Sequence, residues 1–352
     1  MKRILCIALA LMMMVAMVAA CGGGGSSGDG TLYIPVISKG FQHQFWQTVM
    51  AGSDKAAADL GVEIFFTGPE GESAIADQVN MLNVELAKNP DAIALAALDT
   101  NSVLSQLSEA HSKGIPIIGF DSGVPDAPAG QIAANASTDN ESAAALAAEH
   151  MFPVIKAAIE AAAPGDPIYI AVISQDVVSA SVGGRTKGFA QKMFDLASSV
   201  NDSVAITGDF GAINKGPDNA AVLIQVVVGA TPDPTDMTNA ASSVLNYDFL
   251  KGVFMSNEGA VNGVLSAINA GARVPDGCIL VGFDAGEAQK GAVRSGLFFG
   301  SITQDPFMIG YYAVELAVKA ARGESVSDID TGAKWYDSSN MDQADIAILL
   351  YD

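Results

Sequence analysis

From Thr31 onward, short apolar runs alternate with longer segments in which apolar residues recur every three or four positions. The short runs predict β-strands, and the spacing of the longer ones predicts helices. In the first half of the chain the expected strands are 32–37, 62–66, 92–98 and 116–120, with helices such as 45–60 and 73–88 between them. In the second half, after a long helix from Asn140, they are 168–173, 204–207, 252–255, 279–283 and 297–303. Such alternation is typical of βαβ units on a parallel sheet, so we predict an α/β fold with two doubly wound, Rossmann-like lobes.

One segment, 208–239, does not follow the pattern clearly. Its turn-rich ends, 214–219 and 231–236, enclose an apolar run at 220–228. This run fits a buried strand or a helix equally well, so its form stays open.

The N-terminus has the pattern of an export signal. Lys2 and Arg3 precede an apolar run that ends in small residues at position 20, so we expect residues 1–20 to be a signal peptide. The run ends in Val-Ala-Ala-Cys, which resembles the bacterial lipobox and predicts lipidation of Cys21. Residues 21–30, rich in Gly and Ser, then form a flexible tether. The alternative is a retained N-terminal anchor helix; in both cases the body lies outside the cytoplasm, held at a membrane.

Composition excludes several classes of function. Only 16% of the 352 residues are charged, and the net charge of −21 argues against nucleic acid and against a basic face on anionic lipid. Three cysteines cannot form a disulfide framework, and we expect Cys278, in an apolar run, to pack in the core. The three histidines lack metal-ligand spacing, so neither a metal nor a cofactor is expected.

An internal repeat marks two equivalent strand ends. Residues 117–123, IIGFDSG, match residues 280–286, LVGFDAG, and each copy ends a buried strand in Gly-Phe-Asp. In open α/β sheets, ligands bind beyond the carboxyl ends of the strands, so Asp121 and Asp284 are candidate binding residues. Each Asp alone could instead cap the helix that follows it, but two copies in equivalent places favour binding.

Motifs for catalysis are absent: the sequence has no Gly-x-Ser-x-Gly elbow, phosphate-binding loop or Gly-x-Gly-x-x-Gly after the first strand. The first strand is followed by the loop SKGFQHQFWQ, which holds His43, Phe45 and Trp46. An indole among amide and imidazole groups suits a sugar, whose C–H face packs on aromatic rings while its hydroxyls need hydrogen-bond partners. Both aromatic residues could instead belong to the core of the first helix, an interpretation that we favour for Phe45 but not for Trp46.

Three polar residues at other strand ends are further candidates. Arg185 lies among small residues before a helix and offers a fixed fork of donors, although it could be a surface residue paired with acids. Asn257 follows a strand and could bind a hydroxyl or cap the next helix. The pair Asp305-Pro306 has the pattern of a helix start, which leaves Gln304 as the freer contact.

Together these residues resemble the ribose/galactose-type periplasmic binding proteins, the sugar receptors of bacterial ABC importers. The resemblance covers most of the chain after the tether and depends on motifs in family order: Phe-x-x-x-Phe-Trp at 41–46 with Gly52, Gly-Phe-Asp at 119–121, Thr-Asp-Asn at 138–140, Arg-x-x-Gly-Phe at 185–189, Ser-Asn-Glu at 256–258, Gly-Phe-Asp at 282–284 and Gln-Asp at 304–305.

The resemblance implies two lobes of the type I fold, joined by three crossings, that enclose a sugar. By position, Asp121, Arg185, Asn257, Asp284 and Gln304 would bind its hydroxyls or ring oxygen, Trp46 would stack on it, and Asp99 would lie near the cleft mouth. Ser122 stands where ribose binders carry Arg, and the first loop is one residue longer and holds His43. The resemblance therefore supports a simple sugar rather than ribose in particular.

We expect a first lobe of residues 31–138 plus 304–336 and a second lobe of 139–303 plus 337–352. The expected partners are a monosaccharide or a similar small polar ligand, the ABC permease and ATPase subunits, and the membrane through the lipid anchor, with the protein itself a monomer. The alternatives are a lipid-anchored receptor that signals to a sensor kinase or chemoreceptor, a carbohydrate-active enzyme, and a binder of nucleosides or amino acids on the same fold.

Overall fold

The computed structural model describes residues 30–41 and 43–351. The expected signal peptide, Cys21 and all of the tether but Gly30 lie outside these residues. Within them, the chain forms one parallel and one mainly parallel sheet, each covered by helices on both faces, as the alternating pattern predicts.

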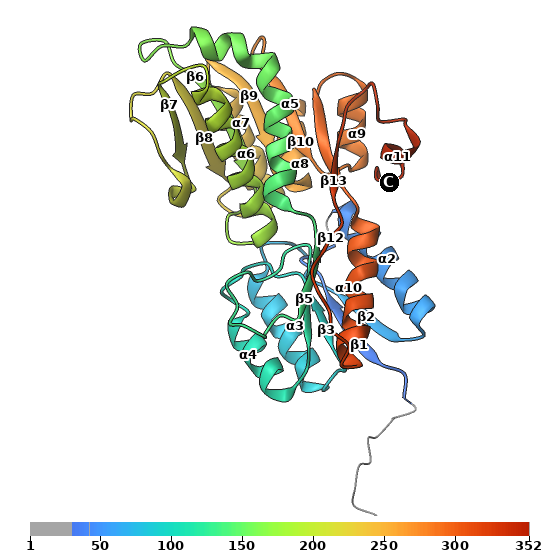
Figure 1. Cartoon of the computed structure of the whole chain (residues 1–352). Coiled ribbons are helices and arrows are strands. Elements are labelled where there is room, and N and C mark those ends of the chain that lie inside the picture. Colours follow the sequence, from blue (N-terminus) through green and yellow to red (C-terminus); the bar gives the residue numbers. More distant parts are fainter. Residues whose placement is uncertain (1–29, 42, 352) are drawn as a thin grey trace, which may run out of the picture. The chain divides into compact units, whose positions relative to one another are not determined.

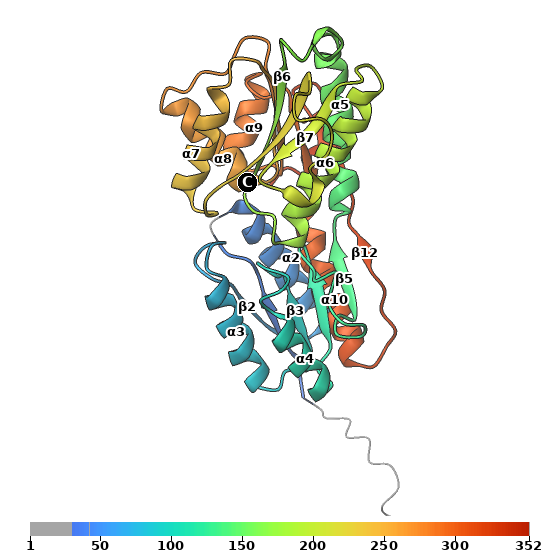
Figure 2. The same cartoon turned by 90° about the vertical axis from the view of Figure 1, so that its left-hand side faces the viewer.

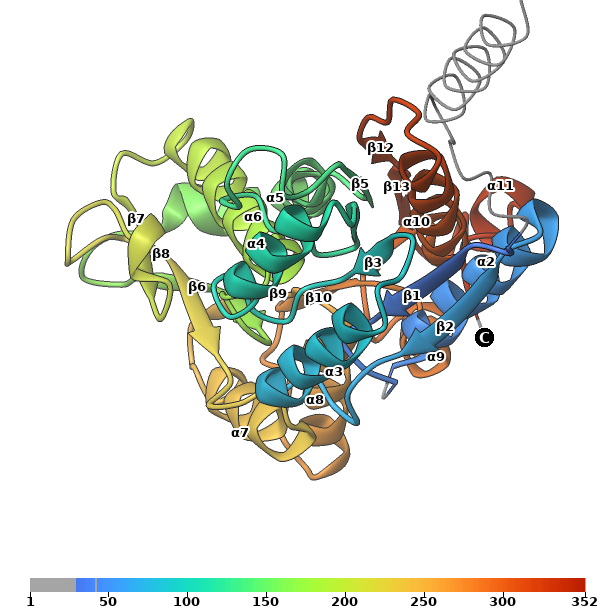
Figure 3. The same ribbon diagram turned by 90° about the horizontal axis from the view of Figure 1, so that it is seen from below.

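The first lobe contains a parallel sheet of six strands in the order β12-β5-β4-β3-β1-β2. Figure 3 shows α2 and α10 on one face of this sheet and α3 and α4 on the other. The strands are β1 (Tyr33–Ile37), β2 (Glu63–Thr67), β3 (Ile93–Leu95), β4 (Ile117–Phe120), β5 (Ala134–Ser137) and β12 (Ile329–Asp330). The helices are α2 (Gln44–Leu60), α3 (Ile75–Ala87), α4 (Leu104–Lys113) and α10 (Pro306–Ala321).

The second lobe contains seven strands in the order β13-β11-β10-β9-β6-β8-β7, of which only β13 is antiparallel to its neighbour. The strands are β6 (Ile168–Ser174), β7 (Val204–Gly208), β8 (Val222–Val228), β9 (Leu250–Met255), β10 (Ile279–Phe283), β11 (Gly300–Gln304) and β13 (Ala333–Tyr336). Figures 1 and 2 show α5 (Asn140–Ala161) and α6 (Ala180–Ser198) on one face, and α7 (Pro234–Leu245), α8 (Glu258–Asn269) and α9 (Glu287–Arg294) on the other. The short helices η1 (Gly211–Ile213) and α11 (Ala344–Ala347) complete the lobe.

The chain crosses between the lobes three times: after β5, after β11 and after β12. The last crossing corrects one expected boundary. We expected the first lobe to extend to residue 336, but β13 pairs with β11 of the second sheet, Ser301 opposite Tyr336. The sequence pattern of β13 does not show which of the two sheets it joins. Because β12 pairs in the first sheet and β13 in the second, the boundary lies between them.

The segment 208–239, left open by the sequence, contains a strand. Its apolar run is β8, which lies between β6 and β7 and is parallel to both. The turn-rich sequence before it follows directly after η1, and the Pro-containing sequence after it starts α7 with Pro234 at the first helical position. A central strand hydrogen-bonded on both sides explains why this run is almost wholly apolar.

Two glycines allow the helices of the first lobe to pack closely. A Cβ on Gly52 of α2 would collide with the backbone of Phe307 in α10, and one on Gly310 would collide with the backbone of Val49. Glycine is therefore required at both contacts. This packing holds α2, and with it the loop at its start, against the sheet.

Cys278 is half-buried and packs against apolar residues of the core, as the apolar run predicts. Burial raises the pKa of its thiol to about 12, so it stays protonated near neutral pH.

Candidate ligand-binding site

A small polar cavity of about 20 Å³ lies where the strand ends of the two sheets face each other. Eight of the ten candidate residues line it: His43, Phe45, Trp46, Asp121, Arg185, Asn257, Asp284 and Gln304. The others in the wall are Lys39, Glu72, Val182 and Glu258.

The repeated aspartates enter this cavity from opposite lobes. Asp121 follows β4 and Asp284 follows β10, with φ angles of 51° and 79°. Few residues other than Gly adopt this left-handed conformation, although Asp tolerates it better than most. The same turn thus directs both carboxylates away from their strands and into the cleft, and both are buried.

Arg185 lies between the two aspartates and is only 3% exposed, so it is not a surface residue. Its Nη2 is 3.7 Å from Asp121 Oδ1, and its Nη1 is 3.7 Å from Asp284 Oδ2. Its Nε donates to Asn140 Oδ1 at 2.7 Å, and its guanidinium stacks 4.0 Å from the ring centre of Phe283. Because its planar fork is stacked on Phe283 and bonded through Nε, Arg185 holds two carboxylates from different lobes at defined positions.

Trp46 and Phe45 form the aromatic part of the wall. Both are buried, and their rings meet edge to face with centroids 4.9 Å apart. Trp46 also meets Phe120 edge to face at 6.3 Å, and its Nε1 donates to Glu72 Oε1 at 2.8 Å. Trp46 is therefore both a wall of the cavity and a packed core residue, which combines the two interpretations that its sequence position allowed.

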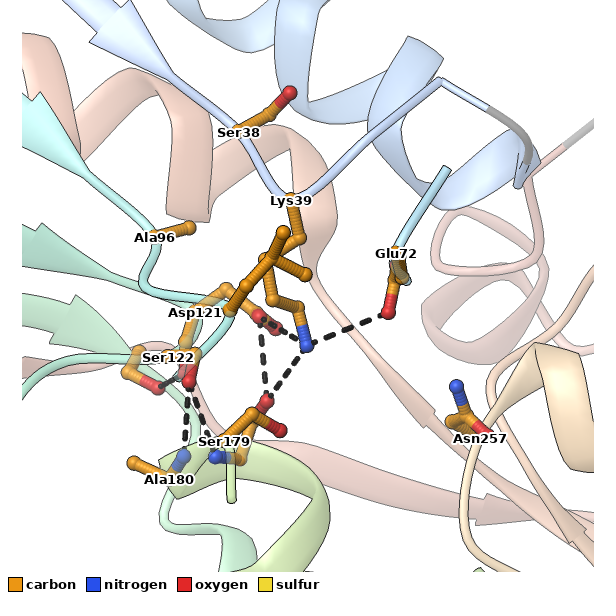
Figure 4. Close-up of polar contacts among 12 residues, drawn as sticks. Ser38, Lys39, Glu72, Ala96, Asp121, Ser122, Ser179, Ala180 and Asn257 are labelled. Carbon is orange, nitrogen blue, oxygen red and sulfur yellow. Dashed lines mark hydrogen bonds and ion pairs between the residues drawn. The ribbon is translucent and has the colours of Figure 1, made fainter. Parts of the chain in front are cut away.

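Lys39 and Glu72, which were not among the candidates expected from the sequence, form the centre of a buried charge network in the first lobe. Figure 4 shows Lys39 between Glu72 and Asp121; its Nζ is 3.7 Å from Glu72 Oε2 and 3.5 Å from Asp121 Oδ2. Burial lowers the pKa of the Lys39 ammonium, but these two carboxylates together with Asp176 outweigh that effect and raise it. Lys39 follows β1 and Glu72 lies in the loop after β2, so a search of every strand end for charged residues would have found both.

The carboxylates of the site differ in how readily they ionise. Burial raises the pKa of Glu72, but Lys39, His43 and the hydrogen bonds from Trp46 and Gln175 overcome this and hold it below its ordinary value. Burial raises the pKa of Asp121 and of Glu258, and neighbouring carboxylates add to the effect. Glu72 is therefore the most firmly ionised of these three groups.

Asn257 and Gln304 supply amides from the second lobe. Asn257 Oδ1 caps α8 by accepting from Ala260 N at 3.1 Å, and its Nδ2 donates to Gln175 Oε1 at 3.0 Å. Gln304 Nε2 donates to Asp284 Oδ1 at 2.7 Å. Its Oε1 is buried and has no hydrogen-bond partner among the described residues, so it has acceptor capacity left to fill.

Asp99 and Ser122 do not line the cavity. Asp99 Oδ1 accepts from the backbone N–H groups of Asn101 and Ser102 at 2.7 and 2.9 Å, which fixes a turn after β3. Ser122 is fully buried, and its Oγ accepts from Ala180 N at 3.0 Å in the second lobe. Asp305 caps α10 by accepting from Met308 N at 3.0 Å, as its position before Pro306 predicts.

Two α/β lobes that enclose a polar, partly aromatic cavity at their strand ends define a bilobed solute receptor. The chain belongs to the periplasmic binding protein family: the model of the periplasmic binding protein domain matches residues 34–325. Members of this family bind solutes outside the cytoplasm and do not transform them.

Solved structures with the same fold cover nearly the whole chain. One, described as an ABC transporter and LacI family transcriptional regulator from Brachyspira murdochii, is 41% identical over 92% of this chain and 99% of that one, with a TM-score of 0.76. A solute-binding protein from Agrobacterium vitis with bound D-fucose is 28% identical over 91% and 100%, with a TM-score of 0.74. A carbohydrate transporter solute-binding protein from Agrobacterium radiobacter in complex with D-arabinose is 25% identical over 92% and 100%, also at 0.74. No curated protein matches the sequence.

Proposed function

We propose that this protein is the substrate-binding receptor of an ABC-type importer and that its ligand is a monosaccharide. The observation that carries the proposal is the cavity between Asp121 and Asp284, with Arg185 between them and Trp46 in the wall. Paired carboxylates, a fixed guanidinium and an aromatic ring match the hydroxyls and the C–H face of a sugar. The D-fucose and D-arabinose in related structures support the same class of ligand.

The function requires a population shift rather than a reaction. The ligand-facing groups come from both lobes, Asp121 from the first and Asn257 and Asp284 from the second. A ligand that contacts all of them binds the closed arrangement better than the open one, so it shifts the population toward closure. The permease then distinguishes the closed receptor from the open one.

The proposal extends to attachment: lipid on Cys21, followed by the Gly/Ser tether of residues 21–30, holds the receptor at the outer face of the cell membrane. Among the described residues no helix has the length and apolarity to span a bilayer. Detergent partitioning of the expressed protein tests the anchor, since wild type should enter the detergent phase and Cys21→Ser should not. Equal partitioning would contradict lipidation at Cys21.

The ligand class is tested by a thermal-shift screen of monosaccharides, nucleosides and amino acids, followed by calorimetry. A ligand that binds only the native state raises the melting temperature, by an amount that grows with its concentration relative to Kd. We expect stabilisation by one or a few neutral monosaccharides, with D-fucose and D-arabinose as the first probes. Stabilisation by nucleosides or amino acids alone would overturn the sugar assignment.

A further inference from the structure

Several helices that begin at the cleft have no side-chain cap from their own N-cap residue, and three of them are capped across the cleft. The N-cap residues of these three are His43 for α2, Ser179 for α6 and Gly286 for α9. The first backbone N–H groups of a helix have no partner within it, so they need an acceptor from elsewhere. In all three helices that acceptor is a side chain of the opposite lobe.

The first of these caps connects β4 of the first lobe to α6 of the second. Ser122 Oγ accepts from Ala180 N at 3.0 Å and from Ser181 N at 3.4 Å. Figure 4 shows Ser122 facing Ala180 at the start of this helix.

The other two caps are reciprocal. Glu258, at the start of α8 in the second lobe, accepts from Gln44 N at 3.3 Å and from Phe45 N at 3.4 Å, at the start of α2. In return, Gln44 Oε1 accepts from Glu287 N at 2.8 Å, at the start of α9. A carboxylate is favoured at a helix N-terminus because it faces the positive end of the helix dipole.

The caps made by Ser122 Oγ and Gln44 Oε1 differ from other bonds across the cleft. Ser73 Oγ donates to Asp233 Oδ1 at 2.9 Å outside the cavity wall, but this bond caps no helix. Gln175 to Glu72 and Lys39 to Ser181 involve Glu72 and Lys39 of the cavity wall, so their effect on closure cannot be separated from their effect on the ligand. Ser122 and Gln44 do not line the cavity. Their caps form only when the lobes meet, and they need no ligand to do so.

We propose that Ser122 and Gln44 are positioning residues that set the closure equilibrium by capping helices of the opposite lobe, and thereby set the ligand affinity. The inference rests on the proposed function only for the identity of the ligand. Since the observed Kd equals the intrinsic Kd divided by the closed fraction, each lost cap raises Kd as it lowers that fraction. Loss of one cap costs a helix roughly 1 kcal/mol, which corresponds to a rise in Kd of about fivefold.

The test measures hydrogen exchange of the full chain by mass spectrometry, without added sugar, in wild type, Gln44→Ala and Ser122→Ala. If the caps act through closure, Gln44→Ala speeds exchange at the start of α9 and also at the start of α6, where Gln44 makes no contact. Ser122→Ala likewise speeds exchange at the start of α6 and also at the start of α9, where Ser122 makes no contact. A merely local role would speed exchange only at the helix that lost its own cap, and that outcome overturns the proposal.

Gly286→Ala provides a variant that removes no hydrogen bond. The backbone of Gly286, with φ −60° and ψ 160°, accommodates alanine, but the added Cβ would lie 3.0 Å from Glu258 Oε1 and 3.2 Å from Gln44 Oε1. We expect it to speed exchange at both α6 and α9 with an unchanged melting temperature. The matched control is Ser53→Ala, which loses hydroxyl bonds to Val49 O and Gly310 O within the first lobe and should leave exchange at α6 and α9 unchanged.

Calorimetry with D-fucose and D-arabinose completes the test. For each sugar that wild type binds, Gln44→Ala and Ser122→Ala should raise Kd about three- to tenfold, while Ser53→Ala should not; unchanged Kd values in both cap variants overturn the proposal. If wild type binds neither sugar, the choice of ligand fails, and the exchange measurements still decide the closure inference.

Discussion

The two copies of Gly-Phe-Asp place their aspartates in the same conformation, yet their neighbours differ. Asp284 is held mainly within its own lobe, by Gln304 Nε2 at 2.7 Å and Glu258 N at 2.9 Å. Asp121 lies 3.5 Å from Lys39 Nζ of its own lobe. Its other two partners, Arg185 Nη2 at 3.7 Å and Ser181 Oγ at 3.3 Å, belong to the second lobe. Asp284 of the second lobe thus has its hydrogen-bond donors before the lobes meet. Asp121 of the first lobe gains two of its partners only when the lobes close.

The residues after each aspartate extend this difference. Ser122 caps a helix across the cleft, whereas its counterpart Ala285 offers only its backbone N–H, which donates to Tyr351 Oη within the second lobe at 3.1 Å. One repeated turn therefore serves two purposes, a carboxylate held by its own lobe in one copy and a contact made on closing in the other. Substitutions of Asp284, of Asp121 and of the Arg185 between them should separate these two roles.

The largest effect is expected for Arg185→Ala, because this residue joins the two copies. Its loss leaves two buried carboxylates without their shared cation, and removing one partner of a buried ion pair typically costs about 3–5 kcal/mol. We expect a marked loss of stability in chemical unfolding and no measurable sugar binding by calorimetry. Arg185→Lys should not restore binding, since a single ammonium cannot match the planar fork; full rescue by lysine would show that charge alone matters.

Asp284→Ala should have the next largest effect, on both stability and binding. It leaves Gln304 Nε2 and Glu258 N without their acceptor, and each buried unsatisfied group costs roughly 1–3 kcal/mol. We therefore expect a lower melting temperature together with at least a hundredfold weaker binding. A variant that lost binding but kept the wild-type melting temperature would contradict the preformed role of Asp284.

Asp121→Asn should separate binding from stability. Burial already raises the pKa of Asp121, which means that its surroundings favour the neutral form. An uncharged amide of the same shape should therefore cost less stability than Asp284→Ala does, while sugar binding weakens about tenfold or more because a charged acceptor is lost. If this variant destabilises the protein as much as Asp284→Ala does, the two copies do not differ as described.

The sequence was sufficient for the fold and for most of the cavity, because strand ends in a parallel sheet converge and their positions follow from hydrophobic periodicity. It could not show that Ser122 turns to the opposite lobe, since that depends on where α6 lies in three dimensions. Glu72 escaped notice for a different reason: it lies in a turn-rich loop, and only its burial beside Lys39 separates it from the many exposed acids of this chain. The lobe boundary near β13 could not be predicted either, because the sequence of a four-residue strand does not specify which of two sheets it joins.

The smallest effect is a pH dependence with opposite signs for two carboxylates beside Lys39. The pKa of Asp121 is raised above 3.8, so wild type loses stability relative to Asp121→Asn as the pH rises from about 4 through the raised value. The pKa of Glu72 is held below 4.5, so its stabilisation is complete above that pH and is lost as the pH falls through the lowered value. Urea unfolding between pH 3 and 7 should therefore show Asp121→Asn gaining on wild type as the pH rises and Glu72→Gln falling behind it. If the stability difference from wild type changed with pH in the same direction for both variants, Lys39 would not pair preferentially with Glu72. Asp121 would then be the fixed partner of Lys39, and it would not depend on closure for its partners.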